Sequence, residues 1–267
     1  MVIRMMERKQ MLILKSANAR RNSLVMRLYY IGLVVLSKLF FRVNFSCARL
    51  GFVCEQLSKG TGREIWARRA RYYYIKALLR GESAGVNNIA SCYATGALGF
   101  EKNPQRAVEL YAKASENGFA GAMHNLGWCY YSGEGVKPDK EKAAKLFCCA
   151  SDLNFPYAHY YLGLLYLRGE GVPRDTRKAV KLLKKAARHG IADAQYDLSV
   201  CYRDGDDGRR RIFYAAFWMM MSALNGCKCA KEIIEGDELC DFLSFKNEDK
   251  THPLEPNGLE SRTDTRR

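Results

Sequence analysis

Signatures of catalysis and of ligand binding are scarce in this chain of 267 residues. No phosphate-binding loop of the Gly-x-x-x-x-Gly-Lys type occurs, and the four histidines follow no His-x-x-x-His spacing typical of a metal site. No nucleophile can be paired with a base from the spacing of their residues. We therefore expect no enzyme activity, no cofactor and no metal site.

A dense disulfide framework is also lacking, although the chain has ten cysteines. The cysteines are spread over residues 47–240, whereas small secreted domains concentrate theirs in a short chain. Cys92, Cys129 and Cys201 each directly precede a tyrosine, which predicts small buried side chains and a reducing, intracellular compartment. The residues Cys227, Cys229, Cys240 and His252 would suffice in number for zinc, but their spacing matches no zinc motif.

Acidic residues are nearly absent from the first part of the chain. Residues 1–80 hold 17 lysines and arginines and only three acidic residues, whereas residues 81–267 hold 26 basic and 25 acidic residues. A basic arm can meet anionic lipid, nucleic acid or an acidic protein, and charge alone does not choose among them. The nearly neutral main body makes nucleic acid an unlikely partner.

The N-terminal segment has no long apolar run. The uncharged stretch from Leu28 to Ser37 covers ten residues, and a bilayer-spanning helix needs about 20. We expect residues 1–47 to form a basic leader with a short apolar segment. A transit peptide, a signal anchor and a helix on a membrane surface all remain open, so residues 1–45 could contact a membrane. Residues 245–267 are polar, contain two prolines and are predicted to be a disordered tail.

A repeat of 36 residues is the clearest positive feature of the sequence. The stretches "LGWCYYSGEGVKPDKEKA" (126–143) and "LGLLYLRGEGVPRDTRKA" (162–179) share a Leu-Gly pair, a tyrosine, a Gly-x-Gly-Val turn, an aspartate and a Lys-Ala pair. Further copies cover about 191–227 and 82–118, and a weaker copy precedes them. Apolar residues recur at steps of three and four within each half, which predicts two amphipathic helices joined by a turn.

Small and capping residues recur at fixed places in the repeat. Gly133 is predicted to end a first helix in the left-handed conformation, and Asn154 to take that conformation after a second helix. Asp139 and Asp175 are placed to cap the second helices. Alanines should allow close helix crossings at positions 143, 150, 179, 186 and 215.

These units resemble Sel1-like repeats, relatives of the tetratricopeptide repeat. The resemblance implies an all-α fold, a right-handed α-solenoid of antiparallel helix pairs with about four to five repeats of 36 residues. We expect the array to cover residues 48–244, including a C-terminal capping helix that begins near Cys229. The family is known for holding protein partners together without catalysis, so the resemblance implies a scaffold or adaptor.

The resemblance also implies that the first helices line a concave face that binds the partner. Aromatic residues and arginine are enriched at interface hot spots, and such a face can hold a peptide or a helix. The candidate partner-binding residues on it are Trp128, Tyr131, Tyr160, Leu164, Leu167, Arg168 and Arg203. Each aromatic ring could instead pack against the next hairpin.

Three further expectations concern packing. Tyr130, Tyr166 and Tyr202 should lie in the core. The run "WMMMSAL" (218–224) should be buried between hairpins, and the basic helix "RKAVKLLKKAARHG" (177–190) should present a solvated outer surface.

The sequence therefore predicts a non-catalytic interaction scaffold that binds a protein partner through the concave face. An alternative is an adaptor tethered to a membrane or targeted to an organelle by its N-terminal segment. A helical-repeat protein that binds RNA is disfavoured, because residues 81–267 carry almost no net charge.

Overall fold

The computed structural model describes residues 28, 31, 46–206, 208–236 and 239–244. The leader expected over 1–47 and the tail expected over 245–267 lie almost entirely outside these residues. The described residues form helices and no strand, which confirms the all-α prediction. None of the described helices combines the length and apolar character needed to cross a bilayer.

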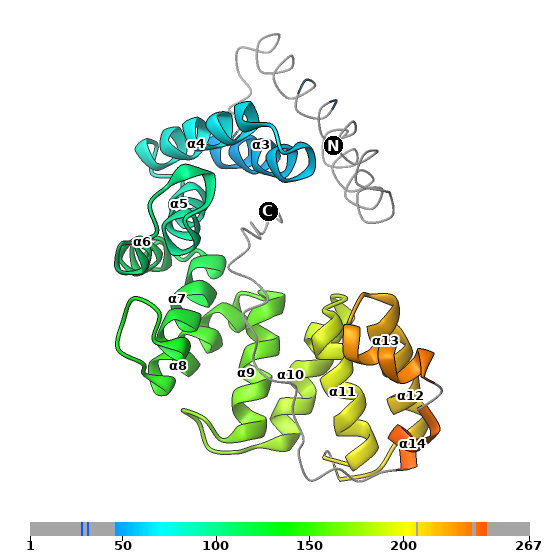
Figure 1. Ribbon diagram of the computed structural model, residues 1–267. Coiled ribbons are helices and arrows are strands. Elements are labelled where there is room, and N and C mark those ends of the chain that lie inside the picture. The colour runs from blue at the N-terminus through cyan, green and yellow to red at the C-terminus, as the bar shows by residue number, and fades with distance from the viewer. Residues whose placement is uncertain (1–27, 29–30, 32–45, 207, 237–238, 245–267) are drawn as a thin grey trace, which may run out of the picture. The chain divides into compact units, whose positions relative to one another are not determined.

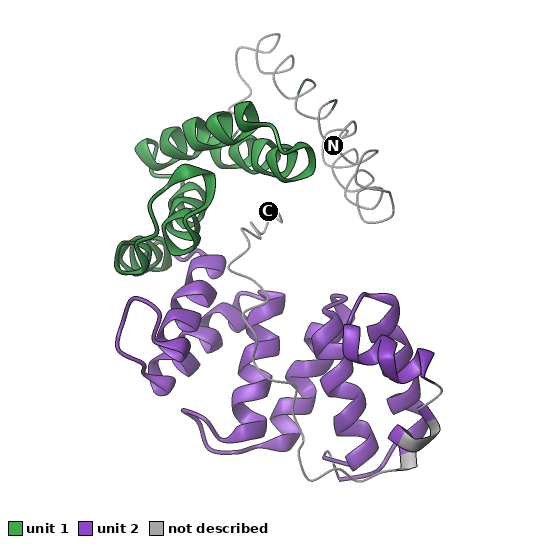
Figure 2. Cartoon of the chain, in the orientation of Figure 1, with its two compact units in different colours: residues 1–117, 258–267 green, residues 118–257 purple. Residues whose placement is uncertain are grey.

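The chain divides into two compact units (Figure 2), of which unit 1 comprises residues 1–117 and 258–267 and unit 2 comprises residues 118–257. The helices of unit 1 are α3 (Cys47–Thr61), α4 (Glu64–Leu79), α5 (Ser83–Thr95), the short 3-10 helix η1 (Ala97–Gly99) and α6 (Pro104–Glu116). Within unit 1, α3 packs on α4, α4 on α5 and α5 on α6. Two helical hairpins are thus stacked side by side.

Unit 2 continues the same plan with three hairpins and an end cap (Figure 1). Its helices are α7 (Ala120–Ser132), α8 (Lys140–Asp152), α9 (Pro156–Arg168), α10 (Thr176–Arg188), α11 (Ala192–Asp204), α12 (Ile212–Leu224), α13 (Lys228–Glu235) and α14 (Leu239–Ser244). Each helix packs on the next from α7 to α14, and α14 also reaches α12. The two units together hold five helix pairs, which confirms the predicted α-solenoid.

The turn within each hairpin is built from repeated backbone contacts. The first helices α7 and α9 end at Gly133 and Gly169, which have positive φ angles of 79° and 69°. The chain then returns so that the amide of the next helix's N-cap residue donates to a tyrosine carbonyl, at 2.8 Å from Asp139 to Tyr130 and 3.0 Å from Asp175 to Tyr166. The same contact joins Asn103 to Tyr93 and Arg211 to Tyr202. The sequence repeat is therefore also a repeat of hydrogen bonds.

The predicted capping residues have the expected roles. Asp139 and Asp175 each accept a hydrogen bond from the amide three residues later, at 2.9 Å, and so satisfy a free donor of the second helix. Asn154 has a positive φ of 58°. The alanines at 143, 150, 179, 186 and 215 are fully buried. The small side chains of these alanines let the helices approach closely, as the sequence predicts.

One glycine marks a close approach between neighbouring repeats. Gly171, in the turn after α9, has a φ of 66°, and a Cβ atom there would lie 2.1 Å from the carbonyl oxygen of Lys140 at the start of α8. Any side chain at residue 171 would therefore collide with the backbone of the preceding repeat.

The C-terminal end of the array is covered by α13 and α14. Met219, Cys227 and Ala230 form a small core, against which Tyr196, Ile233, Leu239 and Phe242 pack. This stretch includes the segment expected to hold a capping helix, and it forms two short helices rather than one. They cover the apolar face that α11 and α12 would otherwise expose at the end of the stack.

Candidate partner-binding surfaces

Three of the seven predicted partner-binding residues keep some accessible surface. Tyr131 lies in the last turn of α7, Leu167 and Arg168 lie in the last turn of α9, and all three side chains are half-buried. Tyr131 and Leu167 are 36 residues apart and thus equivalent in consecutive repeats. The structure therefore brings these residues to corresponding helix ends in unit 2.

Tyr131 is held by polar contacts that cross from one repeat to the next. Its hydroxyl donates to Oε2 of Glu170 at 2.8 Å, and Nζ of Lys140 lies 3.2 Å from Oε1 of the same carboxylate. Burial and the hydrogen bond to Glu170 raise the pKa of Tyr131 to about 12. Burial alone would raise the pKa of Glu170, but the hydrogen bonds from Tyr131 and Lys140 lower it below its usual value. This junction keeps the phenol neutral and the carboxylate charged.

The other four predicted residues lie inside the chain rather than on an accessible face. Trp128 and Leu164 are equivalent positions, exposed by 7% and 0%, and the Trp128 ring packs 5.3 Å from that of Tyr161. Tyr160 is 5% exposed, and its burial, together with the charge of Asp197, raises its pKa well above the usual value. First helices are covered on one side by their own second helix and on another by the neighbouring repeat, so an aromatic ring between buried positions also becomes core.

Arg203 is the most completely enclosed charged candidate. Its guanidinium binds the neighbouring carboxylate of Asp204, with Nε 2.8 Å from Oδ1, and lies 4.5 Å from the centre of the Phe242 ring on α14. The backbone carbonyl of Arg203 also accepts a hydrogen bond from Nε of Arg210 at 2.8 Å. The C-terminal cap thus occupies the surface that the sequence assigned to a partner at this position.

The three tyrosines expected in the core differ in how deeply they are buried. Tyr202 is buried, as predicted, but Tyr130 and Tyr166 are only half-buried, which corrects that expectation. A basic side chain covers each ring instead, since the amines of Lys142 and Lys178 lie 5.4 Å and 5.5 Å from the centres of Tyr130 and Tyr166. A cation also lies over the ring of the buried Tyr202, so this contact recurs in three repeats whether the ring is buried or half-buried.

A large apolar surface lies on α12, where the sequence predicted burial. Met219 and Ser222 are buried, but Met220 and Leu224 of the "WMMMSAL" run are exposed, so that expectation is wrong for these two residues. Exposed apolar residues continue towards the start of the helix; the complete set is Ile212, Phe213, Tyr214, Phe217, Met220 and Leu224. We call this set the α12 outer face. Four of its members, at 213, 217, 220 and 224, follow steps of four, three and four residues and form one stripe.

The exposure of the α12 outer face could have been predicted by aligning α12 with α10 at the 36-residue period, but not from the "WMMMSAL" run alone. Positions 213, 217, 220 and 224 correspond to 177, 181, 184 and 188 on α10, which are arginine or lysine. Since α10 was expected to present a solvated surface, its counterpart on α12 must point outward as well. Reading "WMMMSAL" as a continuous apolar run concealed that Met220 and Leu224 face outward.

The cysteine and metal-binding side chains considered in the sequence lie mostly within the described residues. They contain no cluster of three or more metal-binding side chains, while Cys240's side chain and His252 lie outside the described residues. Cys92, Cys129 and Cys201 are buried, as predicted, and burial raises the pKa of Cys92 and Cys129 to about 12. Thiols held neutral in this way are poor nucleophiles.

One buried histidine has a strongly altered pKa. Nδ1 of His159 on α9 lies 2.7 Å from Oγ of Ser151 on α8, and the side chain is fully enclosed. Burial, aided by the positive charge of Lys185, lowers the pKa of His159 to about 4. The imidazole is therefore neutral and acts as a packed polar group between two repeats.

Comparison with known proteins gives a consistent result for the fold. The family model described as Sel1 repeat matches five consecutive segments, residues 45–82, 83–119, 120–155, 156–191 and 192–227. No curated protein matches the chain.

Two solved structures have the same fold. A Sel1 repeat protein from Oxalobacter formigenes is 26% identical, with a TM-score of 0.58 over 72% of this chain and 82% of that one. The protein c5321, a protective antigen present in uropathogenic Escherichia coli strains and displaying an SLR fold, is 23% identical, with a TM-score of 0.59. That match covers 84% of this chain but only 53% of the other, so it supports the architecture alone.

Proposed function

This chain belongs to the Sel1 repeat family, and from that premise we propose that it is a non-catalytic scaffold that binds a protein partner. Sel1 repeat proteins generally act as protein–protein interaction scaffolds. The observation that carries the proposal for this chain is the α12 outer face. Contiguous exposed apolar side chains of this kind mark interaction sites, because leaving them in water is unfavourable.

The chemistry of the α12 outer face suits a helical partner. The helix α12 contains no charged residue, and its stripe has the spacing with which one helix packs against another. Arg209 and Arg211 lie just before its N-terminal end. The partner segment that fits is an amphipathic helix with an apolar face and with acidic residues near one end.

The predicted concave face supplies a second contact in this proposal. Tyr131, Leu167 and Arg168 retain accessible surface at the ends of consecutive first helices, and the Tyr131–Glu170 junction holds the tyrosine in place. An ordered aromatic ring beside an arginine is the kind of surface that carries binding energy in protein interfaces. Trp128, Tyr160 and Leu164 are buried and Arg203 is covered by α14, so these four residues are not among the contacts proposed here.

Co-purification of the full-length chain tests the scaffold proposal. We expect the double variant Phe213→Ser/Leu224→Ser to lose the proteins that the wild type retains. The matched control is Arg177→Ser/Arg188→Ser, which changes the equivalent positions on α10 and should retain them. If both variants retain the same proteins, the α12 outer face does not bind a partner.

The concave face is tested separately with Tyr131→Ala/Leu167→Ala/Arg168→Ala. We expect weaker retention of the same partner, with Lys181→Ala/Lys184→Ala as a control on the outer side of α10. Unchanged retention would remove the concave face from the proposal.

As an alternative within this proposal, residues 1–45 tether the scaffold to a membrane or target it to an organelle. Apart from Leu28 and Ile31, these residues lie outside the described part of the chain, so support comes from their basic, acid-poor sequence. A fusion of residues 1–45 to a fluorescent protein should localise to a membrane or an organelle, and a diffuse cytosolic signal would refute it. The burial of single cysteines in the repeats supports a reducing, intracellular setting.

A further inference from the structure

The outward side of α4 carries exposed apolar side chains between basic ones. Ile65, Tyr72, Ile75 and Leu79 are all exposed, and Leu79 is 82% accessible. They are separated by seven, three and four residues, which places them on one side of the helix. Arg68 belongs to the same row, three residues after Ile65 and four before Tyr72. We call this row the α4 outer face.

Basic residues also surround the α4 outer face. Arg63 and Arg80 flank the helix and are exposed, as is Arg69, and the amine of Lys76 lies 5.7 Å from the centre of the Tyr72 ring. Among residues 63–80 the sequence has one acidic residue, Glu64. The face is thus apolar and cationic together.

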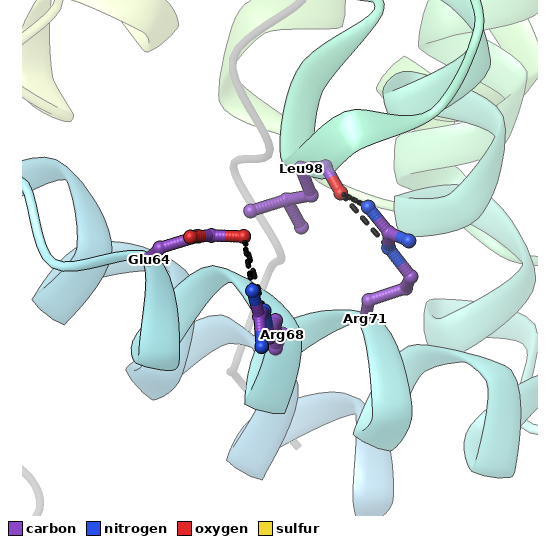
Figure 3. A network of polar contacts seen from close by, with 4 residues as sticks. All are labelled: Glu64, Arg68, Arg71 and Leu98. Atoms are coloured by element: carbon purple, nitrogen blue, oxygen red, sulfur yellow. Dashed lines mark hydrogen bonds and ion pairs between the residues drawn. The ribbon is translucent and has the colours of Figure 1, made fainter.

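Two arginines of α4 make hydrogen bonds within the chain (Figure 3). Arg71 donates from Nε to the carbonyl oxygen of Leu98 at 2.9 Å, so it fastens α4 to the η1 turn. Arg68 instead donates to Oε1 of Glu64, with its Nη2 atom at 2.8 Å, and both side chains are about three-quarters exposed. Such an exposed pair is worth little and can open when another anion is near.

Glu82, the nearest acidic residue after α4, is hydrogen-bonded to the start of α3. Both carboxylate oxygens of Glu82 bind the start of α3, where they accept hydrogen bonds from the amides of Cys47 and Ala48 at 3.1 Å and 3.0 Å. The hydroxyl of Ser46 donates to Glu82 at 2.6 Å. Glu82 therefore caps α3.

We propose that the α4 outer face docks on an anionic membrane surface. Its apolar side chains would enter the boundary between headgroups and acyl chains, while the long basic side chains reach the phosphates. Nucleic acid could bind the arginines, but its phosphate backbone offers no apolar surface on which Ile75 and Leu79 could be buried. The uncharged α12 outer face, by contrast, has no arginine within its stripe.

The sequence before α4 adds charge to the same repeat. Residues 1–45 carry nine basic residues and one acidic residue, and they lead directly into α3, which packs on α4. Basic residues are attracted to an anionic bilayer, so the charge of this segment favours the same class of partner. This inference goes beyond the scaffold proposal, because it concerns another helix and another class of partner.

Vesicle flotation of the purified full-length chain tests the proposal. The probes are vesicles of phosphatidylcholine alone and of phosphatidylcholine mixed with phosphatidylserine. We expect the wild type to float with the mixed vesicles only. Arg68→Glu/Arg69→Glu should bind the mixed vesicles at least about tenfold more weakly, because two favourable charges are lost and two unfavourable ones are added. Ile75→Ser/Leu79→Ser should weaken binding by roughly tenfold through lost apolar contact.

The matched control is Lys181→Glu/Lys184→Glu on α10, which changes the net charge by the same amount. We expect this variant to bind within about twofold of the wild type. All substituted side chains lie on outward-facing sides of their helices, and circular dichroism checks that each variant is folded.

Three results would overturn the proposal. A wild type that ignores mixed vesicles excludes a membrane partner and leaves an acidic protein as the occupant of this face. Equal losses in the α4 and α10 charge variants would show that net charge acts without a docking face. Unchanged binding by both α4 variants would place membrane contact elsewhere in the chain. The α4 variants should retain any partner bound through α12, which separates this test from that of the scaffold.

Discussion

The fourth and fifth repeats have one backbone plan and opposite outer surfaces. In the fourth repeat, residues 156–191, α10 points Arg177, Lys181, Lys184 and Arg188 outward. In the fifth, residues 192–227, the equivalent positions on α12 are Phe213, Phe217, Met220 and Leu224, and Phe213 is 81% exposed. Their inward positions are interchangeable, since Leu183 and Met219 are both fully buried. The inward pattern specifies the fold, which leaves the outward pattern free to differ in function.

The two repeats also differ at one buried polar position. His159 in the fourth repeat corresponds to Gln195 in the fifth, 36 residues later. Gln195 donates from Nε2 to the carbonyl oxygen of Ala187 at 2.9 Å and accepts from Asn225, whereas His159 meets Ser151. One junction can therefore titrate and the other cannot.

The largest expected effect concerns the shared core. Leu183→Ala and Met219→Ala should each lower the free energy of unfolding by about 2–5 kcal/mol, because each leaves a cavity between packed helices. Denaturant unfolding followed by circular dichroism measures both. A loss at Leu183 with none at Met219 would show that the fifth repeat is not packed like the fourth.

The next effect separates the two buried polar positions by pH. The folded-state pKa of His159 is lowered to about 4, below its unfolded value near 6.5, so the unfolded chain binds the extra proton first as the pH falls. Stability should therefore drop between about pH 6.5 and pH 4, by about 3 kcal/mol from this residue. This contribution should be absent in His159→Gln, which copies the fifth repeat, so that the variant loses less stability than the wild type when unfolding is measured across this pH range. An unchanged pH profile in that variant would contradict the role of His159.

The smallest effect concerns the caps of the two outer helices. The carboxylate of Asp175 accepts from the amide of Lys178 at 2.9 Å, whereas Arg211 makes no side-chain cap at the start of α12. Asp175→Ala should lower the melting temperature by about 2–4 °C, and Arg211→Asp should raise it by a similar or smaller amount. Differential scanning calorimetry measures both, with Asp175→Asn as a control that keeps a capping oxygen. A lower melting temperature in Arg211→Asp would mean that Arg211 stabilises α12 by another contact, such as its position above the Tyr202 ring.

Much of the fold could be predicted because the repeat imposes the same physical demands five times. Gly133, Asn154 and Asp139 each answer a local backbone requirement, which can be read without knowledge of neighbouring repeats. The buried alanines and cysteines follow from close helix crossings. The period of the repeat and the alignment of its copies were sufficient to predict these turns, caps and buried small residues.

The candidate binding residues were harder to predict because exposure depends on what the neighbours cover. Trp128 and Leu164 lie between buried positions of a first helix, yet packing on two sides encloses them. Arg203 is covered by α14, which the repeat pattern does not contain. The exposed stripe of α12 was concealed for the opposite reason, since its composition is that of a core helix.

The central claim is that the outward residues of α12 carry partner binding while its inward residues carry the fold. The most direct measurement gives α12 the outer residues of α10 through Phe213→Arg/Phe217→Lys/Met220→Lys/Leu224→Arg and determines both unfolding and partner retention. We predict that the free energy of unfolding changes by no more than about 1 kcal/mol, because exposed substitutions have small effects, and that the partner is lost. A variant that unfolds, or one that retains the partner at undiminished affinity, would contradict this division.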